Sequence, residues 1–212
     1  MLNDPIGDAI HHIRAGGMIA YPTETVWGIA VDATSDAAVG RLRQWKGRED
    51  DAPISVLVAG LADLEVLGFE VGDAAQKLAG AFWPGPLTLV VPCQREFARG
   101  IARPDGAVGV RCSSHPLAGA LARRCEAEGV GPITSTSLNR SHSPAALTIA
   151  EARAILSDDA NGPQLIDVEG AETGGDAEST VVDVTAEPPR VLRWGAVPAA
   201  ELDPVLREIA LA

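Results

Sequence analysis

The chain has 212 residues, of which 46% are hydrophobic, and a formal net charge of −12 at pH 7. This length can bury a sizeable core, so we expect one globular domain over residues 1–212. Such an acidic balance disfavours a protein that wraps nucleic acid through a broad basic face. The sequence has no run of about 20 apolar residues and no basic start followed by an apolar segment, so we expect a cytoplasmic protein without a membrane span.

The acidic excess is concentrated in the last third of the chain. Residues 1–149 contain 13 Lys and Arg against 16 Asp and Glu, whereas residues 150–212 contain 4 against 13. Six arginines from Arg95 to Arg124 accompany only two acidic residues, which predicts a local positive surface suited to a small anionic ligand. The three cysteines are widely spaced and form no Cys-x-x-Cys pair, so we expect reduced core thiols rather than disulfides or zinc ligands.

Hydrophobic periodicity predicts helices alternating with strands, which is typical of a mixed α/β (α+β) fold. The first helix follows Pro5 and ends at Gly16-Gly17. The later elements, in chain order, are a strand at 18–21, a helix ending at Lys46, a strand at 53–58, a helix at 73–82, strands at 87–91 and 108–112, a helix at 116–128, a strand at 133–139, a helix from 148, strands at 165–168, 179–184 and 191–193, and a helix from 198.

Capping residues indicate the ends of two helices. Ser35 or Thr34 can cap the first turn of the second helix, and Gly47 follows its end, so we expect Lys46 in the last turn. Thr148 and Glu151 have the spacing of a capping box, which predicts a helix start at Thr148.

Lys46 and Arg48 are the first candidate binding cluster. Lys46 is one of only two lysines among the 17 cationic residues. Lysine supplies a compact charge that can follow a moving phosphate, whereas an arginine binds phosphate through two parallel hydrogen bonds. The alternative is that cations at the C-terminal end of a helix merely offset its macrodipole.

The predicted strand at 133–139 carries a second polar cluster. Alternation of side chains places one set on a common face, namely Ile133, Ser135, Ser137 and Asn139, and the other set on the opposite face, namely Thr134, Thr136 and Leu138. A buried polar stripe needs hydrogen-bond partners, which a ligand can supply. The alternative is a strand end that passes into turn-forming residues at 139–144.

Further candidate residues lie at the ends of other predicted strands. The segment 22–25 leaves two hydroxyl groups and the Glu24 carboxylate where a strand ends, which alone is an ordinary strand exit. Arg111 can bind a carboxylate bidentately or cap a strand at the surface, and Arg193 can be a solvated charge. The four histidines are scattered without a Ser/His/Asp or Cys/His arrangement, which argues against nucleophilic hydrolysis.

Five motifs occur in a fixed order: Tyr21-Pro22-Thr23-Glu24-Thr25-Val26, Lys46-Gly47-Arg48, Trp83-Pro84-Gly85-Pro86-Leu87-Thr88, Val108-Gly109-Val110-Arg111 and Ser135-Thr136-Ser137-Leu138-Asn139. Together they resemble the YrdC/Sua5 family, the threonylcarbamoyl-AMP synthases of tRNA modification. The resemblance covers about residues 17–195. It implies one YrdC-like domain, with a twisted mixed sheet flanked by helices around a concave ligand cleft, a C-terminal helix at about 198–210 and no additional Sua5-type C-terminal domain.

The resemblance also implies roles for individual residues. Lys46 and Arg48 would be catalytic and would contact ATP together with Ala107, Ser137, Asn139, Ala145 and Arg193. The L-threonine pocket would comprise Thr25, Arg111, Ser135 and Ser179. The segment Gly170–Asp176 resembles the glycine-rich stretch that precedes Ser-Thr in the family. The chain departs from some longer relatives at Leu57 and Ala52, where they carry His and Asn, and from the usual Ala at Leu138.

The activity implied by the resemblance converts L-threonine, bicarbonate or CO2 and ATP into threonylcarbamoyl-AMP and diphosphate. Mg²⁺ would arrive with the ATP phosphates, and neither a protein metal site nor a permanently bound cofactor is expected. The product would pass to a tRNA threonylcarbamoyl-transfer complex for modification of adenosine 37, with at most a weak contact to tRNA or double-stranded RNA. Two alternatives stay open: an enzyme that adenylates carbamoyl phosphate and passes the carbamoyl group on, and an RNA-binding module without catalysis.

Overall fold

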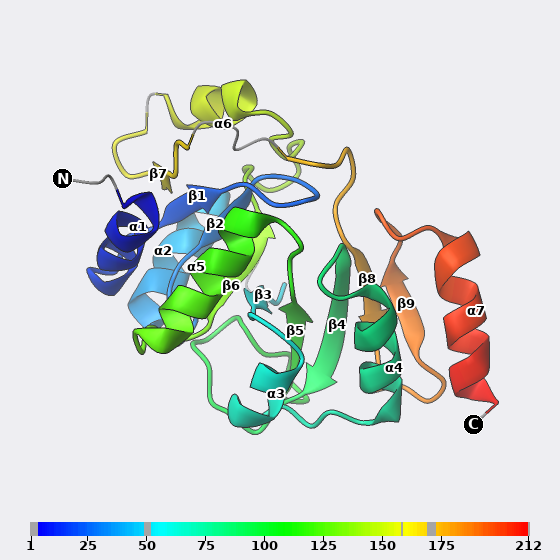
Figure 1. Ribbon diagram of the computed structural model, residues 1–212. Coiled ribbons are helices and arrows are strands. Elements are labelled where there is room, and N and C mark those ends of the chain that lie inside the picture. The colour runs from blue at the N-terminus through cyan, green and yellow to red at the C-terminus, as the bar shows by residue number, and fades with distance from the viewer. Residues whose placement is uncertain (1–3, 49–51, 158, 169–172, 212) are drawn as a thin grey trace.

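A nine-stranded mixed sheet runs through the part of the chain that the computed structural model describes, residues 4–48, 52–157, 159–168 and 173–211. The strands lie in the order β7-β1-β2-β6-β3-β5-β4-β8-β9 (Figure 1). Their bounds are β1 (Ile19–Tyr21), β2 (Gly28–Ala30), β3 (Ser55–Leu57), β4 (Leu87–Pro92), β5 (Ala107–Arg111), β6 (Ile133–Ser137), β7 (Gln164–Leu165), β8 (Thr180–Asp183) and β9 (Arg190–Arg193).

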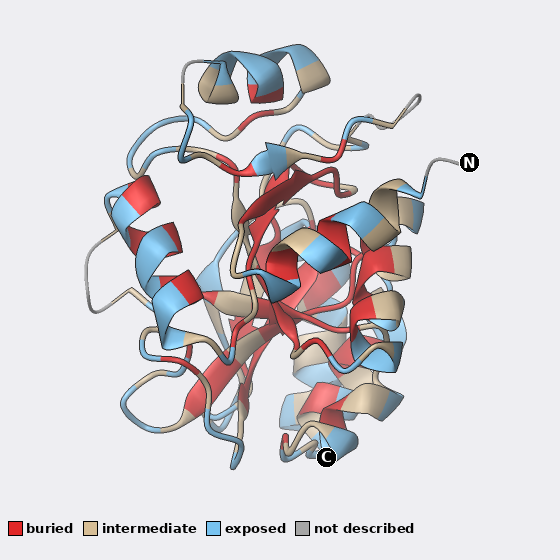
Figure 2. Ribbon diagram, turned by 90° about the vertical axis from the view of Figure 1, so that its left-hand side faces the viewer, coloured by how far each residue is buried: buried red, intermediate tan, exposed pale blue. Residues whose placement is uncertain are grey.

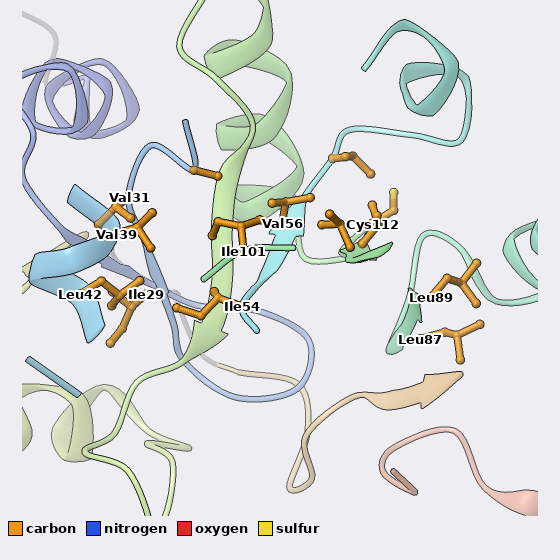
Figure 3. Close-up of a cluster of buried hydrophobic side chains, with 14 of the residues drawn as sticks. Ile29, Val31, Val39, Leu42, Ile54, Val56, Leu87, Leu89, Ile101 and Cys112 are labelled. Atoms are coloured by element: carbon orange, nitrogen blue, oxygen red, sulfur yellow. The ribbon is translucent and has the colours of Figure 1, made fainter. Parts of the chain in front are cut away.

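Helices pack against both faces of this sheet (Figure 1). On one face, Ile10 of α1 and Leu121 of α5 join Tyr21 in a buried cluster. On the other face, α2 contributes Val39 and Leu42 to a larger cluster, part of which Figure 3 shows. The helices are α1 (Pro5–Arg14), α2 (Asp36–Lys46), α3 (Ala62–Val66), α4 (Asp73–Phe82), α5 (Pro116–Ala127), α6 (Ile149–Leu156) and α7 (Ala199–Ala210).

Side-chain alternation along the strands separates a packed face from a ligand-accessible one. In β4, Leu87 and Leu89 enter the larger hydrophobic cluster (Figure 3), whereas Thr88 and Val90 point the other way and line a cavity. Figure 2 shows burial across the molecule: buried residues concentrate in the strands, and exposed residues lie on the outer sides of the helices. The cavity therefore occupies part of a sheet face that α1 and α5 cover elsewhere.

The predicted helices and strands are confirmed in type and order, with ends that differ by a few residues. The Ser35 hydroxyl caps α2 by accepting the Ala38 amide at 3.3 Å, and Gly47 ends that helix in the left-handed region at φ 64°. The Thr148 and Glu151 side chains form the predicted capping box at the start of α6. The capping residues therefore predicted these helix ends correctly.

Two short elements, β2 and α3, were not predicted. β2 has three residues and pairs antiparallel with both β1 and β6, so its position depends on partners distant in sequence. α3 has five residues, and its N-cap Leu61 provides no side-chain hydrogen bond. Neither element is long enough to give a clear hydrophobic period.

Leu138 follows β6 and turns away from the cavity, as the strand alternation predicted. It is fully buried in the larger cluster with Trp27, and its amide donates to the Trp27 carbonyl at 2.7 Å. A smaller side chain at this position would leave a void, because the surrounding core relaxes only in part.

We predict that Leu138→Ala lowers the free energy of unfolding by about 2–5 kcal/mol. The control Val66→Ala, at a side chain that is 80% exposed, should change it by less than about 0.5 kcal/mol. Urea unfolding of both variants measures the difference. Equal losses in the two variants would contradict the packing described for Leu138.

His142 adopts a left-handed backbone conformation, with φ 66°, and among the described residues no other non-glycine residue has a positive φ. The flanking backbone is held on both sides, because the Ser141 amide donates to the Lys46 carbonyl at 2.7 Å and the Ser143 amide to the Arg140 carbonyl at 3.0 Å. These bonds maintain a conformation that a side chain with a Cβ disfavours.

We predict that His142→Gly raises the free energy of unfolding by about 0.5–1 kcal/mol, because glycine adopts this φ without strain. Gly129→Ala is the matched opposite change, since Gly129 has φ 67° and the space that an added Cβ would fill is open. It should lower the free energy of unfolding by a similar amount. Thermal melting shows whether each substitution stabilises or destabilises the protein. If both substitutions stabilise it, or if neither does, the conformational argument is refuted.

Candidate functional site

A cavity of about 540 Å³ opens on the sheet face between β2, β6, β3, β5, β4, β8 and β9. This volume lies in the range of sites that hold small molecules and cofactors. Eight of the predicted site residues line it: Lys46, Arg48, Arg111, Ser135, Ser137, Asn139, Ser179 and Arg193. Segments that are far apart in sequence therefore meet around one hollow.

Lys46 ties the end of α2 to the end of β6. Its Nζ donates to the Ser137 carbonyl at 2.5 Å, to the Asn139 carbonyl at 3.0 Å and to Asn139 Oδ1 at 2.7 Å. The Ser137 hydroxyl also donates to Asn139 Oδ1, at 2.9 Å. Lys46 is only 2% exposed, so it is not a solvated surface cation.

The Lys46 amine loses its proton at a lower pH than an ordinary lysine does. Burial, followed by the nearby Arg48 charge, lowers the pKa of Lys46 to about 7. Burial and the Arg43 charge also lower the pKa of Arg48, which stays protonated because arginine starts so high. An anion placed beside both residues would restore the lysine charge.

Arg48 is oriented by backbone carbonyls. Its Nε donates to the Ala52 carbonyl at 3.1 Å and its Nη2 to the Pro53 carbonyl at 2.8 Å. The Ala52 carbonyl therefore helps to hold Arg48 beside the cavity. Leu57 lies in the core cluster with α1 and α5. We call Lys46, Arg48, Ser137 and Asn139 the anion corner.

The other cations of the cavity have carboxylate partners. Arg193 pairs with Glu178 at 2.5 Å, and Arg103 pairs with Asp183 at 2.7 Å. Arg111 pairs with Glu24 at 3.1 Å between Nη2 and Oε1. Within the described residues, Lys46 and Arg48 form no ion pair with a carboxylate. Glu178, the partner of Arg193, favours the charged forms of Lys46 and Arg48 from beyond ion-pair distance, so the anion corner is the least compensated part of the lining.

Arg111 is the centre of a second group of polar side chains. Its Nη2 donates to Thr25 Oγ1 at 2.5 Å, and Thr23 Oγ1 lies 2.9 Å from Thr25 Oγ1. Thr88, which is opposite Arg111 in the sheet, has its Oγ1 2.8 Å from Ser179 Oγ. We call Arg111, Thr25, Ser135 and Ser179 the Arg111 pocket.

Three predicted site residues do not line the cavity. Thr25 is fully buried and reaches the site through its bond to Arg111. Ala107 begins β5, where its amide donates to Asp105 Oδ1 at 3.1 Å and its carbonyl accepts the Arg103 amide at 2.8 Å. Ala145 lies in the loop after β6, outside the lining. The nucleotide contacts of Ala107 and Ala145 stay predictions.

The loop after β6 is fastened to α2 by an aromatic and charged cluster. The Arg140 guanidinium lies 4.1 Å from the ring centroid of Trp45 and pairs with Asp159 at 2.5 Å. Trp45 Nε1 donates to the same Asp159 Oδ2 at 2.6 Å. This cluster holds the loop that presents Ser141 and His142 to the cavity.

Sequence reasoning assigned no role to several residues that the structure brings to the site. Glu24, Glu178 and Arg103 are the charged members of this group, and His142 lines the cavity from its strained backbone position. Glu24 was noted at a strand exit, but its partner Arg111 lies 87 positions later, and no local pattern reveals that pairing.

The glycine-rich stretch predicted at Gly170–Asp176 lies partly outside the described residues. Of its described part, Gly175 packs on the Glu24–Thr25 backbone, where a Cβ would come within 2.7 Å of the Glu24 carbonyl oxygen. A side chain at this position would displace one of the two segments.

Three of the six arginines in the positive segment expected from Arg95 to Arg124 take part in ion pairs. Arg103 and Arg111 line the cavity as members of ion pairs, and Arg124 pairs with Asp4 at 2.6 Å and Glu128 at 2.9 Å. Residues adjacent in sequence point to different parts of the fold, so their charges do not add on one face.

The remaining compositional expectations concern thiols, metals and membranes. All three cysteines are free, and burial raises the pKa of Cys112 to about 11 and of Cys125 to about 12, as expected for inert core thiols. The described residues contain no cluster of three or more His, Cys, Asp or Glu placed to hold a metal ion. Among them, no helix combines the length and apolarity required to cross a bilayer.

Comparisons with known proteins agree with this geometry. A family model named Sua5_yciO_yrdC, with the description "Telomere recombination", matches residues 11–195. A threonylcarbamoyl-AMP synthase of Pyrococcus abyssi is 37% identical over 94% of this chain, and the match covers 56% of that relative, so the chain spans little more than half its length. A putative threonylcarbamoyl-AMP synthase of Mycobacterium tuberculosis is 36% identical over 95% of this chain and 88% of its own.

A solved structure gives the same result at the level of the fold. P. abyssi Sua5 complexed with L-threonine superimposes with a TM-score of 0.84 at 36% identity, over 94% of this chain and 56% of that one. The nine-stranded sheet, the ordered motifs and the matched family model all lead to one assignment. The chain belongs to the Sua5/YciO/YrdC family.

Proposed function

We propose that this chain is an L-threonylcarbamoyl-AMP synthase that uses L-threonine, bicarbonate or CO2, and ATP. The observation that carries the proposal is the division of one cavity into an anion corner, whose two cations form no ion pair among the described residues, and an Arg111 pocket with compensated charge. A nucleoside triphosphate suits the first and an amino acid the second. The names of the relatives and the threonine complex of P. abyssi Sua5 support the same substrates.

The proposed reaction needs little covalent work from the protein. The neutral amine of threonine adds to CO2 and loses a proton, which gives a carbamate. A carbamate oxygen then forms a bond to the α-phosphorus of ATP as the bond to the diphosphate breaks. Negative charge grows on the departing diphosphate, and fixed cations stabilise such charge most effectively when they are oriented in advance. Lys46 and Arg48 supply this stabilisation, which makes them the proposed catalytic residues.

The other site residues position the substrates. In the anion corner, Ser137 and Asn139 are held against Lys46 and complete the nucleotide side together with Arg193. In the Arg111 pocket, the guanidinium is the receptor for the threonine carboxylate, with Thr25, Ser135 and Ser179 around it. Nη2 of Arg111 is already occupied by Thr25 and Glu24, and Nε is buried, so Nη1 is the group that receives substrate in this proposal.

Mg²⁺ enters this proposal as the counter-ion of ATP. The described residues provide no set of three metal ligands, so the donor set does not fit a protein-held ion and no step is assigned to it. The product would be consumed by a tRNA threonylcarbamoyl-transfer complex in the cytoplasm. The carbamoyl phosphate alternative is less well matched, because the Arg111 pocket would have to accept further negative charge beside Glu24.

The proposal is tested by mass spectrometry of the product formed from ATP, L-threonine and ¹³C-bicarbonate. We expect a labelled threonylcarbamoyl-AMP that requires all three substrates. Lys46→Met and Arg48→Met should each slow its formation by roughly 10²–10³-fold, the usual effect of removing one oriented group that stabilises transition-state charge. Lys77→Met, at the other lysine of the chain, is the matched control. A product that forms without threonine, or wild-type rates in both site variants, would refute the assignment.

Nucleotide binding should also be coupled to proton uptake by Lys46. Its pKa of about 7 in the ligand-free protein leaves most of the amine neutral at pH 8. A bound triphosphate favours the charged form and raises that pKa, so a proton must be taken up between about pH 7 and the ordinary lysine pKa of roughly 10.4.

We therefore predict an uptake approaching one proton per ATP bound at pH 8, and much less from Lys46 at pH 6, where the amine is already charged. Calorimetric titration in buffers of different ionisation enthalpy measures this number directly. Lys46→Met should abolish the uptake at pH 8, and Lys77→Met should retain it. Uptake that survives in Lys46→Met would assign the proton to another group.

A further inference from the structure

The ion pair between Arg111 and Glu24 is placed to control what the Arg111 pocket accepts. Glu24 lies in the turn after β1, whereas Arg111 ends β5. Their side chains are only 14% and 8% exposed. The Ser113 hydroxyl donates to the other carboxylate oxygen, Oε2, and so holds Glu24 toward Arg111. Arg111 lines the cavity, whereas Glu24 is not one of the lining residues and contacts the Arg111 guanidinium.

The pair is not arranged for maximal stability. Glu24 Oε1 lies 3.1 Å from Arg111 Nη2 in an ion pair that lacks hydrogen-bond alignment, and the buried Arg111 Nε has no hydrogen-bond partner among the described residues. A buried polar atom without a hydrogen bond costs free energy, and a buried charge costs more. A carboxylate kept at this cost beside a ligand-binding guanidinium calls for a functional explanation.

Glu24 is ionised at neutral pH. Burial raises the pKa of its carboxyl group, but the Arg111 charge and the Ser113 hydrogen bond outweigh that effect, and the resulting pKa lies below the ordinary value. The positive charge of Arg111 is therefore compensated before any ligand arrives. The anion corner differs, because Lys46 and Arg48 contact carbonyl and amide oxygens there.

This compensation changes which ligands are favourable at Arg111. An uncompensated buried guanidinium would attract any small anion, including phosphate and simple carboxylates. With Glu24 present, a simple carboxylate leaves the pocket with one excess negative charge, whereas a zwitterionic amino acid adds none. Charges a few ångströms apart in a partly buried site interact strongly enough to shift such a preference by roughly tenfold to hundredfold.

We propose that Glu24, acting through Arg111, makes the Arg111 pocket selective for zwitterionic α-amino acids over plain carboxylate anions. Glu24 is a positioning and specificity-determining residue, since its charge compensates the guanidinium and attracts the ammonium group that a correct ligand carries. This inference deepens the proposed function and rests on its use of an amino acid as substrate.

The test compares two ligands that differ in one group. L-threonine and (R)-3-hydroxybutyrate share the carboxylate, the hydroxyl and the carbon skeleton, but the second lacks the amine. Calorimetric titration of the full chain without ATP or bicarbonate gives both affinities. We expect the wild type to bind threonine at least tenfold more tightly, and Glu24→Gln to reduce that ratio by roughly tenfold or more, with tighter binding of hydroxybutyrate.

Ser113→Ala is the matched control, because it removes the hydrogen bond to Glu24 and keeps the charge. Ser113→Ala should either weaken both affinities by the same factor or leave both unchanged, and so preserve their ratio. An unchanged ratio in folded Glu24→Gln would overturn the inference. If that variant does not fold, the wild type still decides, since equal affinities for the two ligands would overturn the inference without any substitution.

The outcome is separable from that of the proposed function. Threonine selectivity that depends on Glu24, with no labelled product from the complete reaction, would defeat the synthase assignment alone. Labelled product together with a ligand ratio that Glu24→Gln leaves unchanged would defeat the role of Glu24 alone.

Discussion

The buried contact between Lys46 and the end of β6 is the interaction on which the binding site depends. In its charged form, the ammonium group of Lys46 can donate to the Ser137 and Asn139 carbonyls and to the Asn139 side chain, and these contacts fix the end of α2 against the sheet. Burying an amine is costly unless its hydrogen bonds are satisfied, and here all three acceptors come from one strand end. The same contact places Arg48, two residues later, beside the cavity. The buried Lys46 amine therefore carries a free-energy cost of burial and also belongs to the proposed binding site.

Charge is distributed very unevenly around this contact. The protein is strongly acidic overall, yet its cavity retains two cations without carboxylate partners among the described residues. Salt screens charges beyond about 8–10 Å in water, so distant surface carboxylates count for less than contacts within the site. Net charge argues against a nucleic-acid wrapper, but it could not locate a small anionic ligand.

The sequence predicted what local chemistry controls. The caps of α2 and α6 and the burial of Leu138 opposite a polar face could be derived from residues within a few positions of one another. Burial of Lys46 could not be predicted in this way, because its acceptors lie more than 90 positions later. The compensation of Arg111 by Glu24 was missed for the same reason, and so was the dispersal of the arginines after Arg95. Three-residue strands such as β2 depend on partners rather than on their own pattern.

The place of β6 in the sheet has a consequence for synthesis of the chain. β6 is inserted between β2 and β3 and pairs antiparallel with both, although it follows them by more than 75 positions in sequence. A nascent chain that has emerged only as far as β5 has two groups of strands with open edges and an unfilled gap between them. At roughly 5–20 residues per second, this condition lasts for seconds before residues 133–137 leave the ribosome. Exposed strand edges invite pairing with other chains, so this interval is when the protein is most exposed to misassembly and has most to gain from a chaperone.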